Sequence, residues 1–285
     1  MKTNSNKISK GIVFGGCSFT WGQGLYYYSN LPTLKEPAPD AFDGLLVTDA
    51  HRRYGATLRY PRLVANHFNT FEVCMLQNGG SEETTFQYLK RAFGLMNGFD
   101  HLFTDTLSFD EIEYIIVQTS QPNRSSFVYT LDGVKYDYTP YSPEIRDGFF
   151  KWLKYKNLDF DKWYSNHVKN MFNQLKDTFS FYESKGIKTL FLNWENDYHP
   201  LVEEDSFMSQ RFIPLHYKGK TYNSIRNLTD ENQNLVIYND LEHFSKPPKD
   251  HHPSKECHQV MASSIIDKIN TAENSNLKNH GKKFI

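Results

Sequence analysis

A serine near the start of the chain and an acid and a histidine near its end provide the side chains of a nucleophilic centre. Ser18 follows a short apolar run and two glycines, and Asp250 precedes His252 in the stretch Asp-His-His-Pro. A serine hydroxyl attacks efficiently when a histidine accepts its proton and an acid holds that histidine in the required tautomer. We therefore expect Ser18 to be a nucleophile, a histidine of the later stretch to be its base and Asp250 to orient that histidine.

The stretches around these residues resemble the first and last motifs of the SGNH (GDSL-type) hydrolase family. The first motif is usually Gly-Asp-Ser-x-Ser, and this chain has Gly-Cys-Ser-Phe-Thr over residues 16–20. The last motif is an Asp shortly before a His-Pro pair, which Asp250 and His252-Pro253 match. The resemblance implies an esterase or acyltransferase. Its implied substrates are small-molecule esters or lipid or carbohydrate O-acyl esters. We expect no cofactor or metal, because no His-x-His or His-x3-His set accompanies the acids.

The chain departs from the family's pattern at two points. Cys17 replaces the usual Asp of the first motif, and Asp250 precedes His252 by two residues where three is more frequent. The second departure makes His251 a rival to His252. Because Pro253 directly follows His252, as in the family's His-Pro pair, we assign the base to His252.

The resemblance also implies an oxyanion hole, in which N–H groups bind the developing negative charge. Its donors here are the N–H of Ser18 and the N–H of a glycine in the second motif, for which Gly80 is the best match and Gly79 the alternative. The Gly-x-Asn-Asp of the third motif is missing. The side chains that could replace its Asn are Asn123, which we rank first, Ser120 and Thr119.

Three other interpretations stay open. Cys17 could be the nucleophile, because thiolates are intrinsically more nucleophilic than alcohols. A metal site could form from Asp250, His251, His252 and His258, although adjacent histidines do not easily face one ion. The chain could also be a catalytically weak or inactive SGNH-like binding or structural module that uses an aromatic-rich insertion as its contact surface.

Five apolar runs predict the strands that position these residues. They cover residues 12–14, 71–76, 112–117, 187–192 and 235–238, and helical patterns separate most of them. This alternation predicts a three-layer α/β sandwich with a mostly parallel sheet, of the SGNH or flavodoxin-like type. In such a sheet the strand ends that carry Ser18, Gly80, Asn123, Asn193 and the Asp250–His252 loop share one edge.

We expect a single domain over residues 11–270, after a polar tail over residues 1–10. The last helix should run from about residue 253 to 269, and residues 271–285 should form a disordered tail. Residues 125–163 hold many aromatic side chains around an Asp132-Gly133 hairpin turn. We interpret them as an insertion over the serine site that forms either a small satellite core or walls for sugar or acyl groups.

Composition limits the other classes of function. The net charge of −1 gives no overall attraction to nucleic acid or to an anionic membrane. No apolar run approaches the ~20 residues that span a bilayer, and the first ten residues are polar, so we expect a cytoplasmic protein. The 3 cysteines, Cys17, Cys74 and Cys257, lie far apart and predict no disulfide framework.

Overall fold

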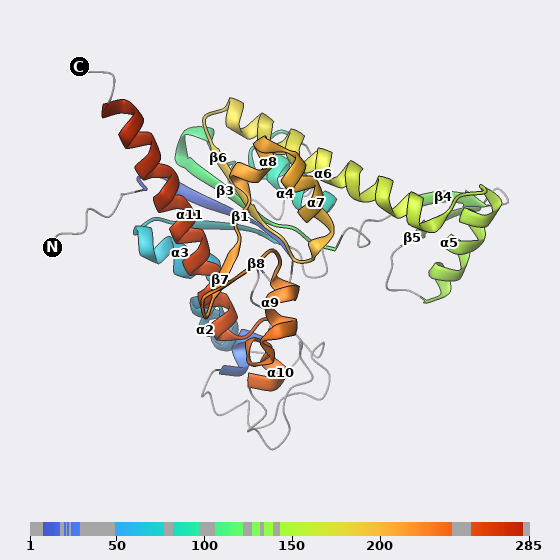
Figure 1. The fold of residues 1–285 in the computed structure, drawn as a ribbon, viewed down its shortest axis with the longest axis horizontal. Helices are drawn as coiled ribbons and strands as arrows, with labels where there is room; N and C mark the ends of the chain where they lie inside the picture. The colour runs from blue at the N-terminus through green and yellow to red at the C-terminus, as the bar shows by residue number, and fades with distance from the viewer. Residues whose placement is uncertain are drawn as a thin grey trace.

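A four-stranded parallel sheet lies at the centre of the protein (Figure 1). The computed structural model describes residues 8–17, 20, 22, 24–28, 49–76, 82–96, 106–121, 127–131, 134–138, 143–240 and 252–281. The strands are β1 (Gly11–Gly16), β2 (Glu72–Leu76), β3 (Ile112–Gln118) and β6 (Lys188–Leu192), in the spatial order β2-β1-β3-β6. All three neighbouring pairs are parallel, which confirms the predicted fold class.

Helices α3 (Tyr60–Phe68) and α11 (Lys255–Gly281) cover one face of the sheet. Ile12 and Phe14 of β1 point toward this face, because alternate residues of a strand face opposite sides. They pack with Val64 of α3 and Met261 of α11 in one apolar core. Shorter elements extend this core: α9 (Ile225–Glu231) and the ribbon of β7 (Leu215–Tyr217) and β8 (Lys220–Tyr222).

Helices α4 (Glu82–Ala92) and α6 (Phe160–Ser184) cover the other face. Val13 of β1 and Ile115 of β3 point toward it and pack against Leu89 of α4 and Leu175 of α6. The short helices α7 (His199–Glu204) and α8 (Ser206–Arg211) complete this second core. Two separate cores on the two faces make the predicted three-layer architecture.

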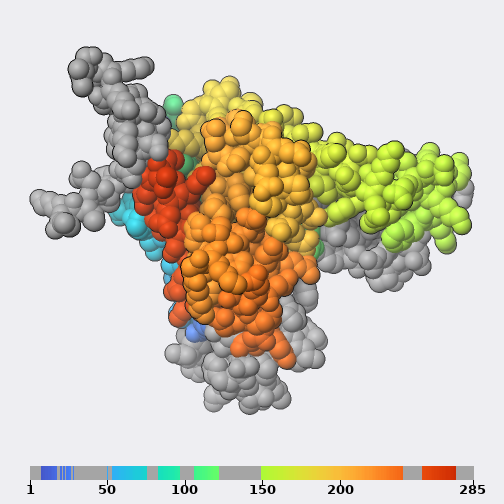
Figure 2. All heavy atoms as spheres, in the orientation of Figure 1, coloured from blue at the N-terminus to red at the C-terminus, as the bar shows by residue number. Residues whose placement is uncertain are grey.

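The aromatic-rich insertion forms an arm at the outer end of α6. It consists of the hairpin of β4 (Phe127–Leu131) and β5 (Val134–Tyr138), followed by α5 (Pro143–Tyr155). Around Phe149, which is fully buried, Trp152 and Trp163 form a small aromatic cluster. The antiparallel pairing of β4 with β5 confirms the predicted hairpin, and the aromatic cluster is the predicted satellite core. The arm extends away from the sheet instead of covering it, and Figures 1 and 2 show it projecting from the body.

The predicted fifth strand is wrong. Residues 235–238 belong to the 3-10 turn η5 (Gln233–Leu235) and the short helix α10 (Ile237–Asp240). Only Val236 between them makes a strand-like contact, an isolated bridge to Pro253. Leu235 and Ile237 are fully buried nonetheless, so the apolar pattern marked a buried segment without fixing its conformation.

The last helix begins and ends later than predicted. It starts at Lys255 instead of Pro253 and continues to Gly281, through most of the expected disordered tail. Glu273 anchors this extension, because its Oε1 accepts hydrogen bonds from Lys188 Nζ and from the Tyr114 hydroxyl, both at 2.5 Å. At the other end of the chain, Ile8 of the expected polar tail is buried in the core beside α11.

The remaining elements connect these layers. They are η1 (Leu25–Tyr28), α2 (Asp49–Leu58), η2 (Phe109–Glu111) and η4 (Asn196–Tyr198). Among the helices of the described ranges, none has both the length and the apolar composition that a membrane crossing needs.

Candidate active site

The order of the strands in the sheet reverses direction beside β1. The chain passes from β1 to β2 on one side and then crosses to β3 on the other, so β1 and β3 are neighbours with connections leading away from each other. In open α/β sheets, ligands bind outside the carboxyl ends of the strands at such a switch point. Ser18 follows β1 by two residues, which places the first motif at this position of the fold.

A buried chain of hydrogen bonds fixes the residues on either side of Ser18. The Thr20 N–H donates to the Cys17 carbonyl at 3.1 Å. The Thr20 hydroxyl donates to Gln118 Oε1 at 2.8 Å and accepts from the Tyr60 hydroxyl at 2.9 Å. Gln118 is the last residue of β3, so the segment after β1 is tied to the neighbouring strand at the switch point.

The two glycines of the first motif allow this close approach. Both lie within β1, so the strand extends through them, past the predicted end at residue 14. A Cβ atom on Gly16 would lie 2.1 Å from Thr20 Oγ1, and one on Gly15 would lie 2.7 Å from Thr85 Cγ2 of α4. Only residues without side chains fit, because such distances are far inside van der Waals contact.

Cys17 has a structural environment. Its side chain is fully buried. Its Sγ lies 3.6 Å from Nε2 and 3.8 Å from Oε1 of Gln118. The Gln118 amide also donates to the Thr119 carbonyl at 2.6 Å. A buried thiol held in this way is shielded from a substrate, which disfavours Cys17 as the nucleophile.

Tyr60 connects the first motif to the start of α11. Its backbone N–H donates to His258 Nδ1 at 3.2 Å, and the two rings stack with centroids 5.9 Å apart. Since Nδ1 accepts this bond, the neutral ring carries its proton on Nε2. Burial, with smaller effects of His252 and Arg59, lowers the pKa of His258 to about 3. His258 is thus a neutral core residue whose Nδ1 is already occupied.

Backbone hydrogen bonds anchor His252 just before α11. The Ile237 N–H donates to the His252 carbonyl at 3.0 Å, and the Ser254 N–H donates to the Leu235 carbonyl at 2.7 Å. Ser254 is fully buried and caps the helix, because its Oγ accepts from the Cys257 N–H at 3.4 Å. Residues 235–237, which were predicted as part of a fifth strand, therefore position the segment that carries the predicted base, although they form no strand.

The ends of β3 and β6 meet through Thr119 and Asn193, both buried. The Thr119 hydroxyl donates to Asn193 Oδ1 at 3.4 Å and accepts from the Trp194 N–H at 3.3 Å. This occupies Thr119, one of the three side chains considered for the oxyanion hole. Asn193 Nδ2 has no acceptor in the part of the chain that the structure describes, so Asn193 offers an amide donor at this edge.

Acidic side chains follow β6. Glu195 Oε1 accepts from Arg226 at 2.6 Å and from Gln121 Nε2 at 2.5 Å. Burial, and then the neighbouring charge of Glu195, raises the pKa of Asp197. His199 Nε2 lies 2.8 Å from Asn223 Nδ2 and 3.2 Å from Glu203 Oε1. These contacts join the loops beside the sheet edge and give His199 a structural role.

Most of the predicted site residues lie outside the described residues: Ser18, Gly79, Gly80, Asn123, Asp250 and His251. The structure does describe residues near the predicted site: Tyr60 hydrogen-bonds to Thr20 of the first motif and to His258, which follows the last motif. The sequence analysis missed this link. The available signals were a glutamine at the end of a mostly apolar strand and a histidine on the apolar face of the last helix.

No family model and no curated protein matches the chain. Among solved structures, it is similar to an acetyl xylan esterase from the rumen bacterium Butyrivibrio proteoclasticus, with 13% identity, a TM-score of 0.44 and coverage of 93% of this chain and 64% of the other. It is also similar to a family two carbohydrate esterase from Clostridium thermocellum in complex with cellohexaose, with 12% identity, a TM-score of 0.40 and coverage of 94% and 66%.

A third similar structure comes from Desulfitobacterium hafniense DCB-2 and is described as a lipolytic protein of the G-D-S-L family. It has 11% identity and a TM-score of 0.34, and the match covers 91% of this chain and 99% of the other. The chain spans only 64 to 66% of the length of the first three carbohydrate esterases that it matches. At these TM-scores, the case for a function depends on the chain's own residues.

Replacing Thr20 with valine tests the buried hydrogen-bond chain. The shape of the side chain is kept, but Tyr60 loses its acceptor and Gln118 loses a donor. We expect the free energy of unfolding, measured by urea denaturation, to fall by about 1–3 kcal/mol. Thr57→Val is the matched control, since that exposed hydroxyl bonds only to the nearby Tyr54 carbonyl. Equal losses in the two variants would contradict a special role for Thr20.

The pKa of His258 makes stability depend on pH. In the unfolded chain this histidine binds a proton below pH ~6.5, whereas in the folded protein it stays neutral down to about pH 3. Stability is therefore full above pH 6.5 and falls as the pH decreases, by up to about 1.4 kcal/mol per pH unit. His258→Asn keeps an acceptor for the Tyr60 N–H and should flatten this slope. The exposed His67, changed to Asn, should leave it as it is, and an unchanged slope in His258→Asn would refute the assignment.

Proposed function

We propose that the protein is an SGNH-type serine hydrolase that cleaves or transfers an acyl group of an ester. Ser18 is the nucleophile, His252 the general base and acid, and Asp250 the residue that orients His252. The substrate is a small-molecule, carbohydrate or lipid O-acyl ester, as the motif resemblance implies. No metal ion or cofactor takes part in the proposed mechanism.

The observation that carries this proposal is the link through Tyr60. Its hydroxyl bonds to Thr20, two residues after Ser18, and its backbone N–H bonds to His258, six residues after His252. One buried residue thus contacts both Thr20, close in sequence to the proposed nucleophile, and His258, in the helix that follows the proposed base.

The switch point supports the same assignment. A nucleophile there stands at the open carboxyl edge of the sheet, where a substrate can approach. The packed glycines and the buried Thr20 side chain give the first motif a rigid base. Rigid support matters because acyl transfer requires the attacking oxygen and the carbonyl carbon to be held in a near-attack geometry.

In the proposed reaction, the Ser18 hydroxyl attacks the ester carbonyl as its proton passes to His252. His252 then gives that proton to the departing alcohol, which leaves an acyl group on Ser18. Water, or an acceptor alcohol in a transferase, attacks this acyl-enzyme in the second half of the reaction. The N–H groups of Ser18 and Gly80, with the Asn123 side chain, bind the oxyanion in both halves.

A binding module is the second candidate, and the arm favours it. Phe150, Tyr155, Leu158 and Phe160 expose 39 to 66% of their surface around the α5–α6 junction. Exposed apolar groups gathered in one place commonly mark a contact surface. If binding were the whole function, purified protein would bind its partner but hydrolyse no ester. Substitution of these four residues with serine would then abolish binding.

Covalent labelling tests the nucleophile. A fluorophosphonate reacts with a serine that an adjacent base has activated, so mass spectrometry of the digested adduct should locate the label on Ser18. Ser18→Ala should remain folded and lose hydrolysis of an activated ester such as p-nitrophenyl acetate by at least about 1,000-fold. A label on Cys17, or hydrolysis that survives in Ser18→Ala, would rule out the serine mechanism.

Neighbouring substitutions test the assignment of the base. His252→Ala should abolish hydrolysis, and Asp250→Asn should reduce kcat by orders of magnitude, because the histidine loses its tautomer partner. His251→Ala is the internal control and should have a small effect. All three changes lie in one short segment, so similar melting temperatures would exclude unfolding as the cause. A larger loss in His251→Ala than in His252→Ala would overturn the proposed triad.

A further inference from the structure

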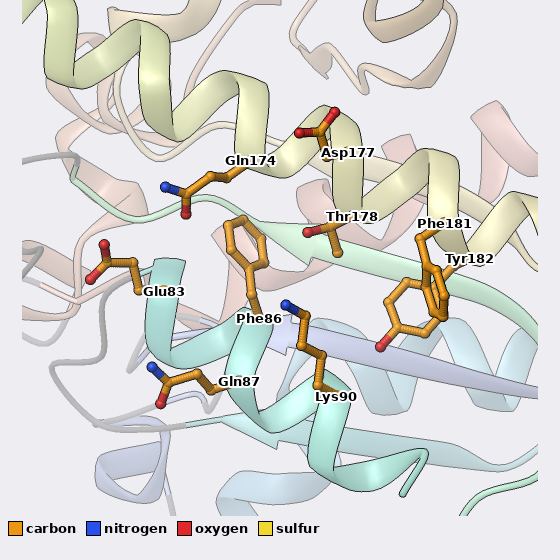
Figure 3. A pocket seen from close by; sticks show the side chains of 9 residues that line it. All are labelled: Glu83, Phe86, Gln87, Lys90, Gln174, Asp177, Thr178, Phe181 and Tyr182. Carbon is orange, nitrogen blue, oxygen red and sulfur yellow. The ribbon is translucent and has the colours of Figure 1, made fainter. Parts of the chain in front are cut away.

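A groove runs between α4 and α6 on the face of the molecule shown in Figure 3. Its volume is about 630 Å³, within the range of small-molecule sites. Its walls are the facing sides of the two helices: Glu83, Phe86, Gln87 and Lys90 of α4, and Gln174, Asp177, Thr178, Phe181 and Tyr182 of α6. The resemblance and the proposed mechanism assign no role to these residues.

The Tyr182 hydroxyl is an unused hydrogen-bond donor in this groove. The side chain is only 1% exposed, and its oxygen has no partner in the described parts of the chain. Figure 3 shows this hydroxyl directed into the space between the helices, on the side of Lys90. Burial raises the pKa of Tyr182, so the group stays protonated. A buried hydroxyl without a partner costs stability, and an acceptor atom placed in the groove would remove that cost.

The other polar groups of the groove supply both donors and acceptors. Gln87 of α4 and Gln174 of α6 carry amides, which do both. Glu83 and Asp177 add two carboxylates, whereas Lys90 adds one ammonium group. The lining is therefore not basic enough to select an anion, and its mixture of groups suits a neutral ligand with many hydroxyls.

Aromatic side chains provide the apolar part of the lining. Phe86 forms the floor in the middle of the groove and is 5% exposed, while Phe181 stands at one end and is 39% exposed. A sugar ring has an apolar C–H face and a rim of hydroxyls. The C–H face packs well on an aromatic ring, and the hydroxyls can meet amides and carboxylates around it.

We propose that the α4–α6 groove is a binding site for a neutral saccharide of one or two rings, with the Tyr182 hydroxyl donating to a ligand oxygen. Tyr182 lies near the end of α6, just before the chain enters β6, so it is at the amino ends of the strands. Ser18 follows the carboxyl end of β1. The groove site is thus separate from the candidate active site, and the proposal does not depend on the serine mechanism.

The test uses the full chain and three neutral disaccharides, maltose, cellobiose and lactose, titrated one at a time and followed by ligand-observed NMR. At least one should bind, and Tyr182→Phe should weaken it roughly five- to tenfold, the effect of one lost hydrogen bond. Gln87→Ala should also weaken binding. Glucose 6-phosphate should bind less well than the preferred disaccharide, because its charge faces Glu83 and Asp177.

Tyr155→Phe is the matched control, since it removes a hydroxyl from an exposed tyrosine on the arm. It should leave the affinity unchanged. The melting temperature of Tyr182→Phe without ligand should equal or exceed that of the parent protein, because the lost hydroxyl had no partner. The proposal is overturned if none of the disaccharides binds, if Tyr182→Phe binds as tightly as the parent, if the phosphate sugar is preferred, or if Tyr182→Phe lowers the melting temperature.

Discussion

The architecture around the candidate site depends on how one buried tyrosine satisfies its polar groups. Tyr60 is fully buried, and its ring packs edge-on against Phe14 at 5.8 Å. A phenol hydroxyl in such a place must be hydrogen-bonded, and burial raises its pKa, so it remains a donor. Thr20 accepts this bond, and Gln118 accepts the next one. The three side chains form an uncharged chain of hydrogen bonds, in which a shift of any one side chain would break a bond to its neighbour.

This chain of hydrogen bonds also explains why glycines stand beside it in β1. Because the Thr20 side chain packs directly against β1, the strand has no room for a side chain at Gly16. The packing of α4 on β1 excludes a side chain at Gly15. A charged residue in place of Gln118 would have to be desolvated, which costs several kcal/mol. The amide instead satisfies two oxygen partners and contacts the Cys17 sulfur. Packing and hydrogen bonding therefore select the same residues.

Local patterns in the sequence predicted the layers of the fold, but they did not predict contacts between residues far apart in the chain. The runs that became β1, β2, β3 and β6 are apolar and short, and the Asp-Gly hairpin is defined by its own turn residues. Residues 235–238 are equally apolar, yet among the described residues their strand-like contact is a single bridge from Val236 to Pro253, and the segment forms a 3-10 turn and a short helix. The contact of Tyr60 with His258 joins residues 198 positions apart, and no local pattern encodes it. The extension of the last helix beyond residue 269 is likewise supported by hydrogen bonds between residues far apart in sequence, from Lys188 and Tyr114 to Glu273.

The pairing of α3 with α11 has a consequence for how the chain matures during synthesis. Val64 and Phe68 are made early, but Met261 and Ile265, which cover them, are made about two hundred residues later. Until then, the part of this core that α11 covers stays exposed to water. Contacts between residues so far apart form slowly, and exposed apolar surface promotes aggregation. The growing polypeptide thus has a long interval in which a chaperone could bind the face that the last helix finally closes.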